Sequence, residues 1–309
     1  MTSKEKINQL QTIIINNLTL LINHDYWLLE VPYYPNVGDA LIWQGELDFL
    51  KRLPYRCKGM SSYETPIPQT IGKNDIILLQ GGGNFGDLWE HPQSYRNKVI
   101  EKYPNNKVII LPQSVFWQDE HNMFACADFM AKHMNVTICA RDKYSYELLQ
   151  KNFKNNIILL PDMAFCIDTR KWDYHKVTKQ ALLLKREDKE QKPYAEIEEL
   201  IAKDNMTICD WIPFTEDCWQ KNWLRRTRKY LPFLNSWYAA HFYLPYMVNS
   251  GIQLIGSHEK IYSTRLHAAI LSVLLDKAKD LTWFDNSYGK NANFYESWLK
   301  DVDGITFIE

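Results

Sequence analysis

Short apolar runs alternate with helical segments along most of this chain, and that alternation restricts its fold more than any other feature. In the first half, apolar runs of strand length occur at 26–31, 75–80, 107–111, 136–140 and 157–160. Helical patterns lie between most of them, for example at 40–50 and 143–151. Strands that alternate with helices at this spacing are typical of a parallel, doubly wound α/β sheet.

A second series of the same kind begins after a polar stretch at 168–180. Its apolar runs occur at 181–184, 206–212, 252–255 and 281–284, again with helical patterns between them. The two series predict two Rossmann-like βα domains, residues 1–167 and 168–309, that face each other across a crevice. The last helical segment, 293–299, is a candidate to pack back on the first domain. Ligands of such sheets bind beyond the carboxyl ends of the strands.

Length, charge and cysteine content narrow the class of protein. A chain of 309 residues is long enough for two domains of about 150 residues each. Its formal net charge of −1 gives no reason to expect a nucleic-acid partner. Six cysteines without a C-x-x-C pair indicate buried free thiols in a reducing compartment. We find no secretory signal and no apolar stretch of about 18 residues, so we expect a cytoplasmic protein without a membrane-spanning helix.

Two basic residues occupy an unexpected place in the segment 263–275. Apolar residues at helical spacing predict a helix there, with Ser263 or Thr264 as its N-cap. The N-terminus of a helix carries a partial positive charge and disfavours cations, yet Arg265 and His267 lie in the expected first turn. Free backbone N–H groups, the helix dipole and two basic side chains together predict an anion-binding site.

The segment 36–39 follows the first expected strand and reads Asn-Val-Gly-Asp. One interpretation is structural, with Gly38 in a turn and Asp39 as the cap of the following helix. The other is functional, since a carboxylate that faces the crevice can take a proton from a hydroxyl group. The sequence leaves both open.

A glycine-rich segment at 80–87 follows the second expected strand and matches G-x-G-x-x-G at positions 81, 83 and 86. A dinucleotide site would also require an acidic residue at the end of the next strand. That strand is instead followed by Pro112, Gln113 and Ser114. We therefore favour a glycine-rich turn whose backbone amides approach an anion or a sugar over a site for NAD or FAD.

Arg141 and Asp162 each end an expected strand of the first series. A guanidinium at the end of a buried strand requires a carboxylate or phosphate partner, so Arg141 either forms a structural salt bridge or binds the same anion as Arg265. Asp162 suits a structural role and a catalytic one equally well. The histidines and cysteines have no metal-like spacing, and we predict no metal site.

An ordered set of segments resembles the polysaccharide pyruvyl transferase family: 36–39, 81–86, 111–114, 141–142, 161–162, 263–267 and 285–290. The resemblance runs from roughly residue 30 to residue 298. It implies a fold like that of the two-domain GT-B glycosyltransferases. It also implies transfer of a pyruvyl group from phosphoenolpyruvate to a sugar of a polysaccharide precursor, usually as a cyclic ketal.

The resemblance also implies a donor site. In that family, an Arg-Leu-His segment and an arginine of the first domain hold the donor. The matching residues here are Arg265, Leu266 and His267 for the segment and Arg141 for the arginine. A phosphate and a carboxylate on the donor suit two arginines and a helix N-terminus. The expected donor-binding set is completed by residues that flank these groups: Ser263, Thr264, Gly82 and Gly83.

Roles in catalysis and acceptor binding follow from this chemistry. His267 is the candidate acid that protonates the methylene carbon of the donor, because nearby anionic groups favour its cationic form. Asp39 is the candidate base, and Asp162 is the second candidate. Polar residues beside the glycine-rich segment and the first helix are expected to bind the acceptor: Asn36, Asn84 and Asp87. No step requires a redox cofactor, and none clearly requires a metal.

Alternatives to this function remain open. A GT-B glycosyltransferase with a nucleotide-sugar donor would have the same fold and a different donor. A dinucleotide-binding oxidoreductase and a non-catalytic sugar-binding relative are less compatible with the motifs.

The segment 219–247 combines nine aromatic residues with five interleaved lysines and arginines. A pair of helices whose aromatic side chains pack inside the second domain accounts for this composition. The alternative is a surface that contacts a membrane peripherally, with Trp and Tyr at the depth of the headgroups and cations on anionic lipid. Such a surface would suit an acceptor sugar carried on a lipid diphosphate.

Overall fold

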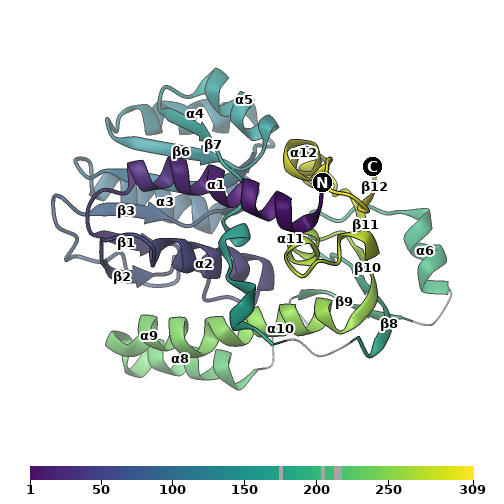
Figure 1. Cartoon of the computed structure of the whole chain (residues 1–309). Coiled ribbons are helices and arrows are strands. Elements are labelled where there is room, and N and C mark those ends of the chain that lie inside the picture. Colours follow the sequence, from purple (N-terminus) through teal and green to yellow (C-terminus); the bar gives the residue numbers. More distant parts are fainter. Residues whose placement is uncertain (174–176, 203–205, 212–217) are drawn as a thin grey trace.

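A computed structural model describes residues 1–173, 177–202, 206–211 and 218–309, and it contains two parallel sheets (Figure 1). The first sheet has the strand order β2-β1-β3-β5-β6-β7, with β4 paired to β5. Its strands are β1 (Tyr26–Leu29), β2 (Cys57–Ser61), β3 (Ile76–Leu79), β4 (Gly82–Gly86), β5 (Val108–Phe116), β6 (Val136–Ala140) and β7 (Asn156–Leu159). Every pairing in it is parallel.

The second sheet has the order β12-β11-β10-β8-β9 and is also parallel throughout its described strands. These strands are β8 (Lys179–Leu184), β9 (Thr207–Cys209), β10 (His258–Ser263), β11 (Leu281–Phe284) and β12 (Thr306–Ile308). The predicted fold class, an α/β protein with two Rossmann-like sheets, is confirmed.

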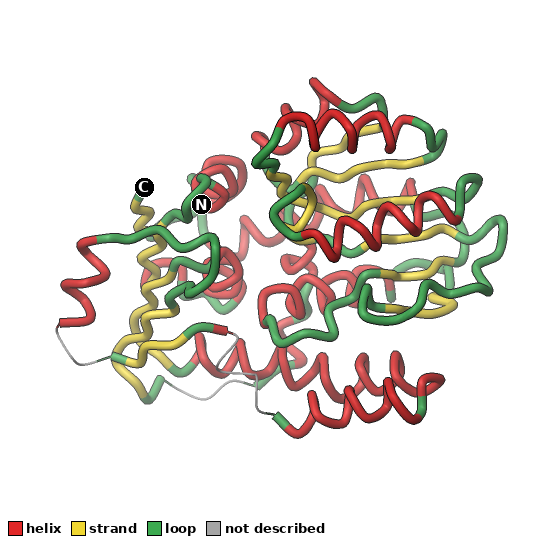
Figure 2. Tube along the Cα trace, turned by 180° about the vertical axis from the view of Figure 1, so that it is seen from behind, coloured by secondary structure: helices red, strands yellow, loops and turns green. Residues whose placement is uncertain are grey.

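Helices flank both sheets, as the views from the front and from behind show (Figures 1 and 2). Those of the first half are α1 (Ser3–Leu21), α2 (Val37–Leu50), α3 (Glu90–Lys102), α4 (Glu120–Ala131) and α5 (Lys143–Asn152). Those of the second half are α6 (Ala195–Ala202), α8 (Trp219–Tyr230), α9 (Pro232–Tyr238), α10 (Leu244–Gly256), α11 (Leu266–Leu274) and α12 (Lys290–Phe294). Short helical turns include η1 (Met163–Cys166), η2 (Thr169–Lys171), η3 (Ala239–Tyr243), η4 (Ala278–Asp280) and η5 (Tyr295–Leu299). No helix in the described parts is long and apolar enough to cross a bilayer.

Two central strands, β3 and β6, are apolar except for Thr137, because helices cover both faces of the sheet. All four residues of β3 and all five of β6 are buried. The sequence therefore identifies these strands as continuous apolar runs rather than alternating ones.

The two sheets share one apolar core, which passes through α2, α10 and α11. Helix α2 packs against both α10 and α11. A Cβ atom on Gly251 of α10 would lie 2.5 Å from Cγ1 of Val37, so the absence of a side chain at 251 permits this close approach. The contact between the two halves is therefore apolar and extensive, and it sets the width of the crevice between the sheets.

The end of the chain returns to the first half. Trp298 Nε1 donates a hydrogen bond of 2.7 Å to the carbonyl oxygen of Arg141, and Lys143 N donates one to Ser297 Oγ. Helix α9, from the second half of the sequence, contacts β2 at the edge of the first sheet. We propose the boundary at 167/168 as a division between the two sheets, with these later helical segments packed across it.

Some elements differ from the sequence-based expectations. The predicted strand 252–255 is wrong: these residues end helix α10, and the strand is β10, whose sequence His-Glu-Lys-Ile-Tyr-Ser lacks an apolar run. The glycine-rich segment is not a turn, because Gly82–Gly86 forms β4 beside β5. The predicted strand 206–212 is observed as Thr207–Cys209, and residue 212 lies outside the described residues.

Candidate active site

The segments that follow the strands of both sheets meet at one cavity, as expected for parallel α/β sheets. The first half of the chain contributes Asn36, Asp39, Gly83 and Arg141 to its lining. The second half contributes Arg186, Trp211, Arg265, Leu266, His267 and Lys290. This inner cavity measures about 40 Å³ and shares several lining residues with an outer cavity of about 470 Å³. Within the described residues, the inner lining combines four cations and a histidine with a single carboxylate, that of Asp39.

His267 lies against a buried ion pair from the first half. Arg141 Nη1 donates to Asp162 Oδ2 over 2.7 Å, and both side chains are almost fully buried. His267 Nε2 lies 3.3 Å from the same Oδ2 atom. His267 Nε2 forms no hydrogen bond with any described residue, so its contact with the Asp162 carboxylate is electrostatic.

Asp162 is held in its charged form by these neighbours. Burial by itself would raise the pKa of its carboxyl group, but His267 and Arg141 outweigh burial and leave this pKa well below its usual value. Its other oxygen accepts a hydrogen bond of 2.8 Å from Ala164 N. Asp162 therefore has the contacts of a group that orients His267 and Arg141.

Gly38 brings His267 close to the first turn of α2. A Cβ atom at this position would lie 2.6 Å from His267 Nδ1, which is closer than any real contact. The helix begins at Val37, and its N-cap is Asn36, whose Oδ1 accepts hydrogen bonds from Gly38 N and Asp39 N. The structural interpretation of Asp39 as an N-cap is thus wrong, since Asp39 lies inside the first turn.

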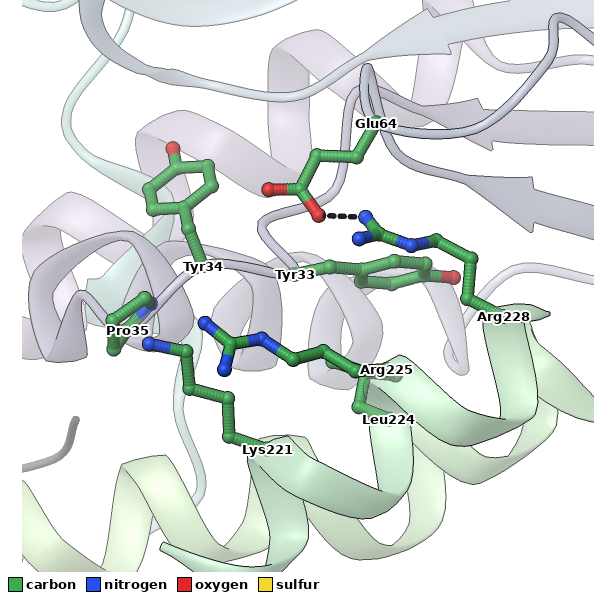
Figure 3. Close-up of a pocket in the computed structure, with 8 residues that line it drawn as sticks. All are labelled: Tyr33, Tyr34, Pro35, Glu64, Lys221, Leu224, Arg225 and Arg228. Atoms are coloured by element: carbon green, nitrogen blue, oxygen red, sulfur yellow. Dashed lines mark hydrogen bonds and ion pairs between the residues drawn. The ribbon is translucent and has the colours of Figure 1, made fainter. Parts of the chain in front are cut away.

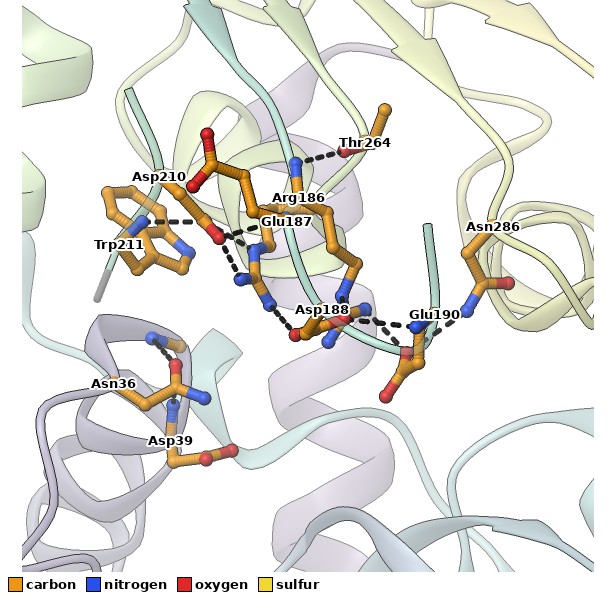
Figure 4. A network of polar contacts seen from close by, with 12 residues as sticks. Asn36, Asp39, Arg186, Glu187, Asp188, Glu190, Asp210, Trp211, Thr264 and Asn286 are labelled. Carbon is orange, nitrogen blue, oxygen red and sulfur yellow. Dashed lines mark hydrogen bonds and ion pairs between the residues drawn. The ribbon is translucent and has the colours of Figure 1, made fainter. Parts of the chain in front are cut away.

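Arg265 is fixed by two carboxylates of the second half, those of Asp188 and Asp210, which Figure 4 labels. Its Nε and Nη2 atoms donate to the two oxygens of Asp210, and Nη1 donates to Asp188 over 3.2 Å. Arg265 is itself the N-cap of α11, which begins at Leu266, so the prediction of Ser263 or Thr264 as N-cap is wrong. Ser263 Oγ instead accepts from Arg265 N, and Thr264 Oγ1 accepts from Arg186 N.

Arg186 and Lys290 also line the cavity and were not predicted as site residues. Arg186 Nη1 and Lys290 Nζ both donate to Glu190 Oε2, over 2.5 and 3.2 Å. Burial alone would raise the pKa of Glu190, but Lys290 and Arg186 outweigh it and lower this pKa to about 2. Burial lowers the pKa of Lys290 to about 8, with Arg186 and Arg141 adding to the shift and Glu190 opposing it.

A signal for both residues exists in the sequence. Arg186 follows a strand as Arg141 does, and Lys290 ends the segment 285–290 that contributes to the family resemblance.

Glycines at the start of β4 leave room for these cations. A Cβ atom on Gly83 would lie 2.4 Å from Lys290 Nζ and 3.1 Å from Arg141 Nη2. Gly82 has a φ of +148°, a conformation that favours glycine, and lies near Asp39. Gly81 N donates to the buried Glu46 carboxylate over 2.9 Å, which ties the segment to α2.

The predicted base and acceptor residues differ in their surroundings. Asp39 is partly exposed, and its Oδ2 accepts a hydrogen bond of 3.0 Å from Tyr34 OH. Asn36 and Asn84 line the outer cavity, although Asn84 Oδ1 already accepts from Arg96. Asp87 accepts hydrogen bonds from Gln118 N, Asp119 N and Asn122 Nδ2, so its contacts are those of a loop-stabilising residue and do not support its predicted role.

No group of three or more His, Cys, Asp and Glu side chains suited to a metal ion occurs in the described residues. All six cysteines are free thiols.

Comparison with known proteins covers most of the chain. The family model described as polysaccharide pyruvyl transferase matches residues 36–278. EpsO of Bacillus subtilis (strain 168), whose name assigns it to the pyruvyl transferases, is 34% identical over 99% of this chain and 93% of its own length. Pyruvyl transferase 1 of Schizosaccharomyces pombe is 26% identical over 91% of this chain and 72% of its own length.

The fold also occurs in a solved structure. An uncharacterized protein of Klebsiella pneumoniae superimposes with a TM-score of 0.64 at 19% identity, covering 97% of this chain and 98% of that one. The family match spans far more than half of the chain, and the similarity to EpsO extends over nearly all of it. This chain therefore belongs to the polysaccharide pyruvyl transferase family.

Proposed function

We propose that this protein transfers the pyruvyl group of phosphoenolpyruvate to a sugar of a polysaccharide precursor and forms a cyclic ketal. The observation that carries the proposal is the inner cavity, where Arg141, Arg186, Arg265 and Lys290 surround the start of α11. Their carboxylate partners hold them in place from outside this lining. A small donor with a phosphate and a carboxylate matches preorganised cations and a helix N-terminus.

The reaction needs an acid at the donor. His267 protonates the methylene carbon of the enol, so that positive charge develops at the adjacent carbon. A sugar hydroxyl attacks that carbon and loses its proton, and the C–O bond to phosphate breaks. A second hydroxyl then attacks the same carbon, loses its proton and closes the ketal ring. The carboxylate of Asp162, 3.3 Å from His267 Nε2, orients the imidazole for this transfer.

Asp39 is the proposed base for the attacking hydroxyl. Its carboxylate lies in the linings of both the inner and the outer cavity, between the proposed donor and acceptor sites. Tyr34 OH donates to Oδ2, which leaves Oδ1 to accept a hydrogen bond from a sugar hydroxyl.

The outer cavity is the proposed acceptor site. Its volume of about 470 Å³ lies within the range of small-molecule sites. Aromatic rings of Tyr34, Tyr63 and Trp89 line it together with Asn36 and Asn84, and such a mixture suits the apolar faces and hydroxyl groups of a sugar.

We propose a glycan acceptor carried on a lipid diphosphate, and a cytoplasmic enzyme that contacts the membrane peripherally through 219–247.

Ligand-dependent stabilisation separates this proposal from its main alternative, a nucleotide-sugar glycosyltransferase. Phosphoenolpyruvate, a UDP-sugar and NAD are added separately in thermal unfolding, because a ligand raises the melting temperature only when it binds the folded state. Stabilisation by phosphoenolpyruvate alone is the expected result. Stabilisation by the UDP-sugar alone selects the alternative. Incubation of labelled phosphoenolpyruvate with a panel of glycan acceptors then identifies the product.

Substitution of Gly38 by alanine is expected to lower kcat at least about tenfold without loss of the fold. The new methyl group would displace the imidazole of His267. A displacement of about 1 Å of a reacting group can lower the rate about 100-fold. Helix α2 itself favours the change by up to about 1 kcal/mol, since alanine is a better helix former than glycine. Steady-state rates and the melting temperature test both parts. A variant with unchanged kcat would show that His267 moves freely at this contact.

Donor binding is expected to weaken above about pH 8. Lys290 carries its charge below a pKa of about 8, so the cationic form that attracts the donor is lost as the pH rises through that value. The value of kcat/KM for phosphoenolpyruvate should therefore decline on the alkaline side with a midpoint near this pKa. The matched variant is Lys290→Arg, which keeps its charge and should move the decline to higher pH. An identical profile for both proteins would assign the decline to another group.

A further inference from the structure

Helix α8 carries three cations on one side, and they line a cavity of about 160 Å³ (Figure 3). Lys221, Arg225 and Arg228 follow the i, i+4, i+7 spacing of one helix side and point toward the segment Tyr33–Pro35 and Glu64. Arg228 forms an ion pair with Glu64. Arg225 has no ion-pair or hydrogen-bond partner among the described residues. Among the described residues, the lining combines one carboxylate with three cations, a formal charge of +2.

The opposite side of α8 is aromatic and exposed. Successive residues of an α-helix are rotated by about 100°, which places Trp219, Trp223 and Tyr230 about half a turn from the three cations. Trp219 is 59% exposed and Tyr230 is 67% exposed. The next segments also expose large apolar side chains: Leu231, Phe233, Leu234, Trp237 and Phe242. The expectation that the aromatics of 219–247 pack inside the protein holds only for a minority of them, such as Tyr238 and Tyr243.

The basic cavity adjoins the proposed acceptor site. Tyr34, Pro35 and Lys221 line both this cavity and the outer cavity. The outer cavity in turn shares Asp39 with the inner cavity that holds His267. A molecule with an anionic group between Lys221 and Arg225 would therefore extend directly toward the proposed base.

We propose that the cavity between α8 and Tyr33–Pro35 binds the diphosphate group of a polyprenyl-diphosphate-linked glycan, with the aromatic side of α8 inserted in the membrane that carries the lipid. This subsite rests on the proposed function, since it assigns a lipid-linked substrate to the same enzyme. The charge of +2 complements a diphosphate diester. A helix is about 10–12 Å across, so a helix with its aromatic side at the headgroup boundary presents its opposite side to the phosphate region.

Vesicle flotation tests the subsite without any catalytic readout. Neutral phosphatidylcholine vesicles contain either a polyprenyl diphosphate or the corresponding polyprenol. The wild-type protein should bind the diphosphate vesicles about tenfold more strongly, because each cation near anionic lipid adds to the attraction. Arg225→Gln should remove most of this difference. Arg225 is exposed, and the melting temperature of the variant verifies that it folds.

The matched control is Arg226→Gln, one residue further along the same helix. Arg226 lies over the ring of Trp223, at 5.5 Å from the centroid, and does not line the basic cavity. This control should retain the preference for diphosphate within about twofold. An equal loss in both variants would assign the preference to the overall charge of α8 and overturn the subsite. Equal binding of both kinds of vesicle by the wild type would also overturn it.

Kinetics separate failure of the subsite from failure of the function. Two KM values are compared, one for a diphosphate-linked acceptor and one for the same glycan without its lipid diphosphate. Arg225→Gln should raise the first about tenfold relative to the second. An unchanged ratio of the two KM values, in an enzyme that turns over phosphoenolpyruvate, overturns the subsite alone. Diphosphate-dependent flotation in a protein without pyruvyl transfer supports the subsite and contradicts the proposed function.

Discussion

Replacement of His267 by alanine is expected to lower kcat for pyruvyl transfer by about 100-fold to 10,000-fold, the usual contribution of a general acid. The imidazole occupies the inner cavity beside Asp162, and it is the only histidine in the lining among the residues that the structure describes. The other basic groups of the described lining are three arginines, which do not act as acids at neutral pH, and Lys290, whose pKa is about 8. Release of phosphate from phosphoenolpyruvate in the presence of acceptor measures the effect.

The fold should survive this change. The Arg141–Asp162 ion pair does not depend on His267, and Asp162 retains its hydrogen bond from Ala164. His121→Ala is the control, because that side chain is 94% exposed and lies outside the cavity. It should match the wild type in rate. Near wild-type turnover in His267→Ala would remove His267 from the mechanism.

Loss of the Arg141 charge is expected to have the largest effect on stability. Arg141→Met leaves the buried carboxylate of Asp162 without its arginine partner, and an orphaned charge of this kind costs about 3–5 kcal/mol. For a chain of this size the melting temperature should fall on the order of 10 °C. Donor binding should weaken as well, because Arg141 lines the inner cavity. Thermal unfolding and the KM for phosphoenolpyruvate measure the two effects.

A double variant separates these effects. In Arg141→Met with Asp162→Asn, the buried charge is absent, and the asparagine oxygen can still accept the hydrogen bond from Ala164 N. The double variant should recover at least about half of the decrease in melting temperature, whereas its donor binding should remain weak. A double variant as unstable as the single one would show that packing around Arg141, and not the orphaned carboxylate, determines its stability.

Strand and helix positions were predictable where burial produces a simple pattern. The runs 136–140 and 281–284 coincide with β6 and β11, because strands covered on both faces are mostly apolar. The same rule misplaced a strand at 252–255, where α10 is buried among other helices, and missed β10, which contains Glu259 and Lys260 at exposed positions. A short apolar run does not distinguish a strand from a buried helix.

The site was partly predictable for a similar reason. Arg265 and His267 stand out locally, because cations are unfavourable beside a helix N-terminus. Arg186 has a weaker local signal, its position after a strand, and its place in the site depends on Glu190 and Lys290, which are 100 residues apart. Asp87 was assigned to the acceptor from its position after the glycines, but its oxygens face backbone amides of the segment after β5.

The sequence by itself determined the parallel α/β architecture and the kinds of side chain at the carboxyl ends of the strands, because periodicity and local helix electrostatics express both. Only the tertiary structure decided which cations line the cavity and which carboxylates hold them from behind. The contact between His267 and Asp162 joins two segments that follow strands of different sheets, β10 and β7. It exists because α10 and α11 pack on α2, and the packing of two sheets against each other leaves no local pattern in the chain.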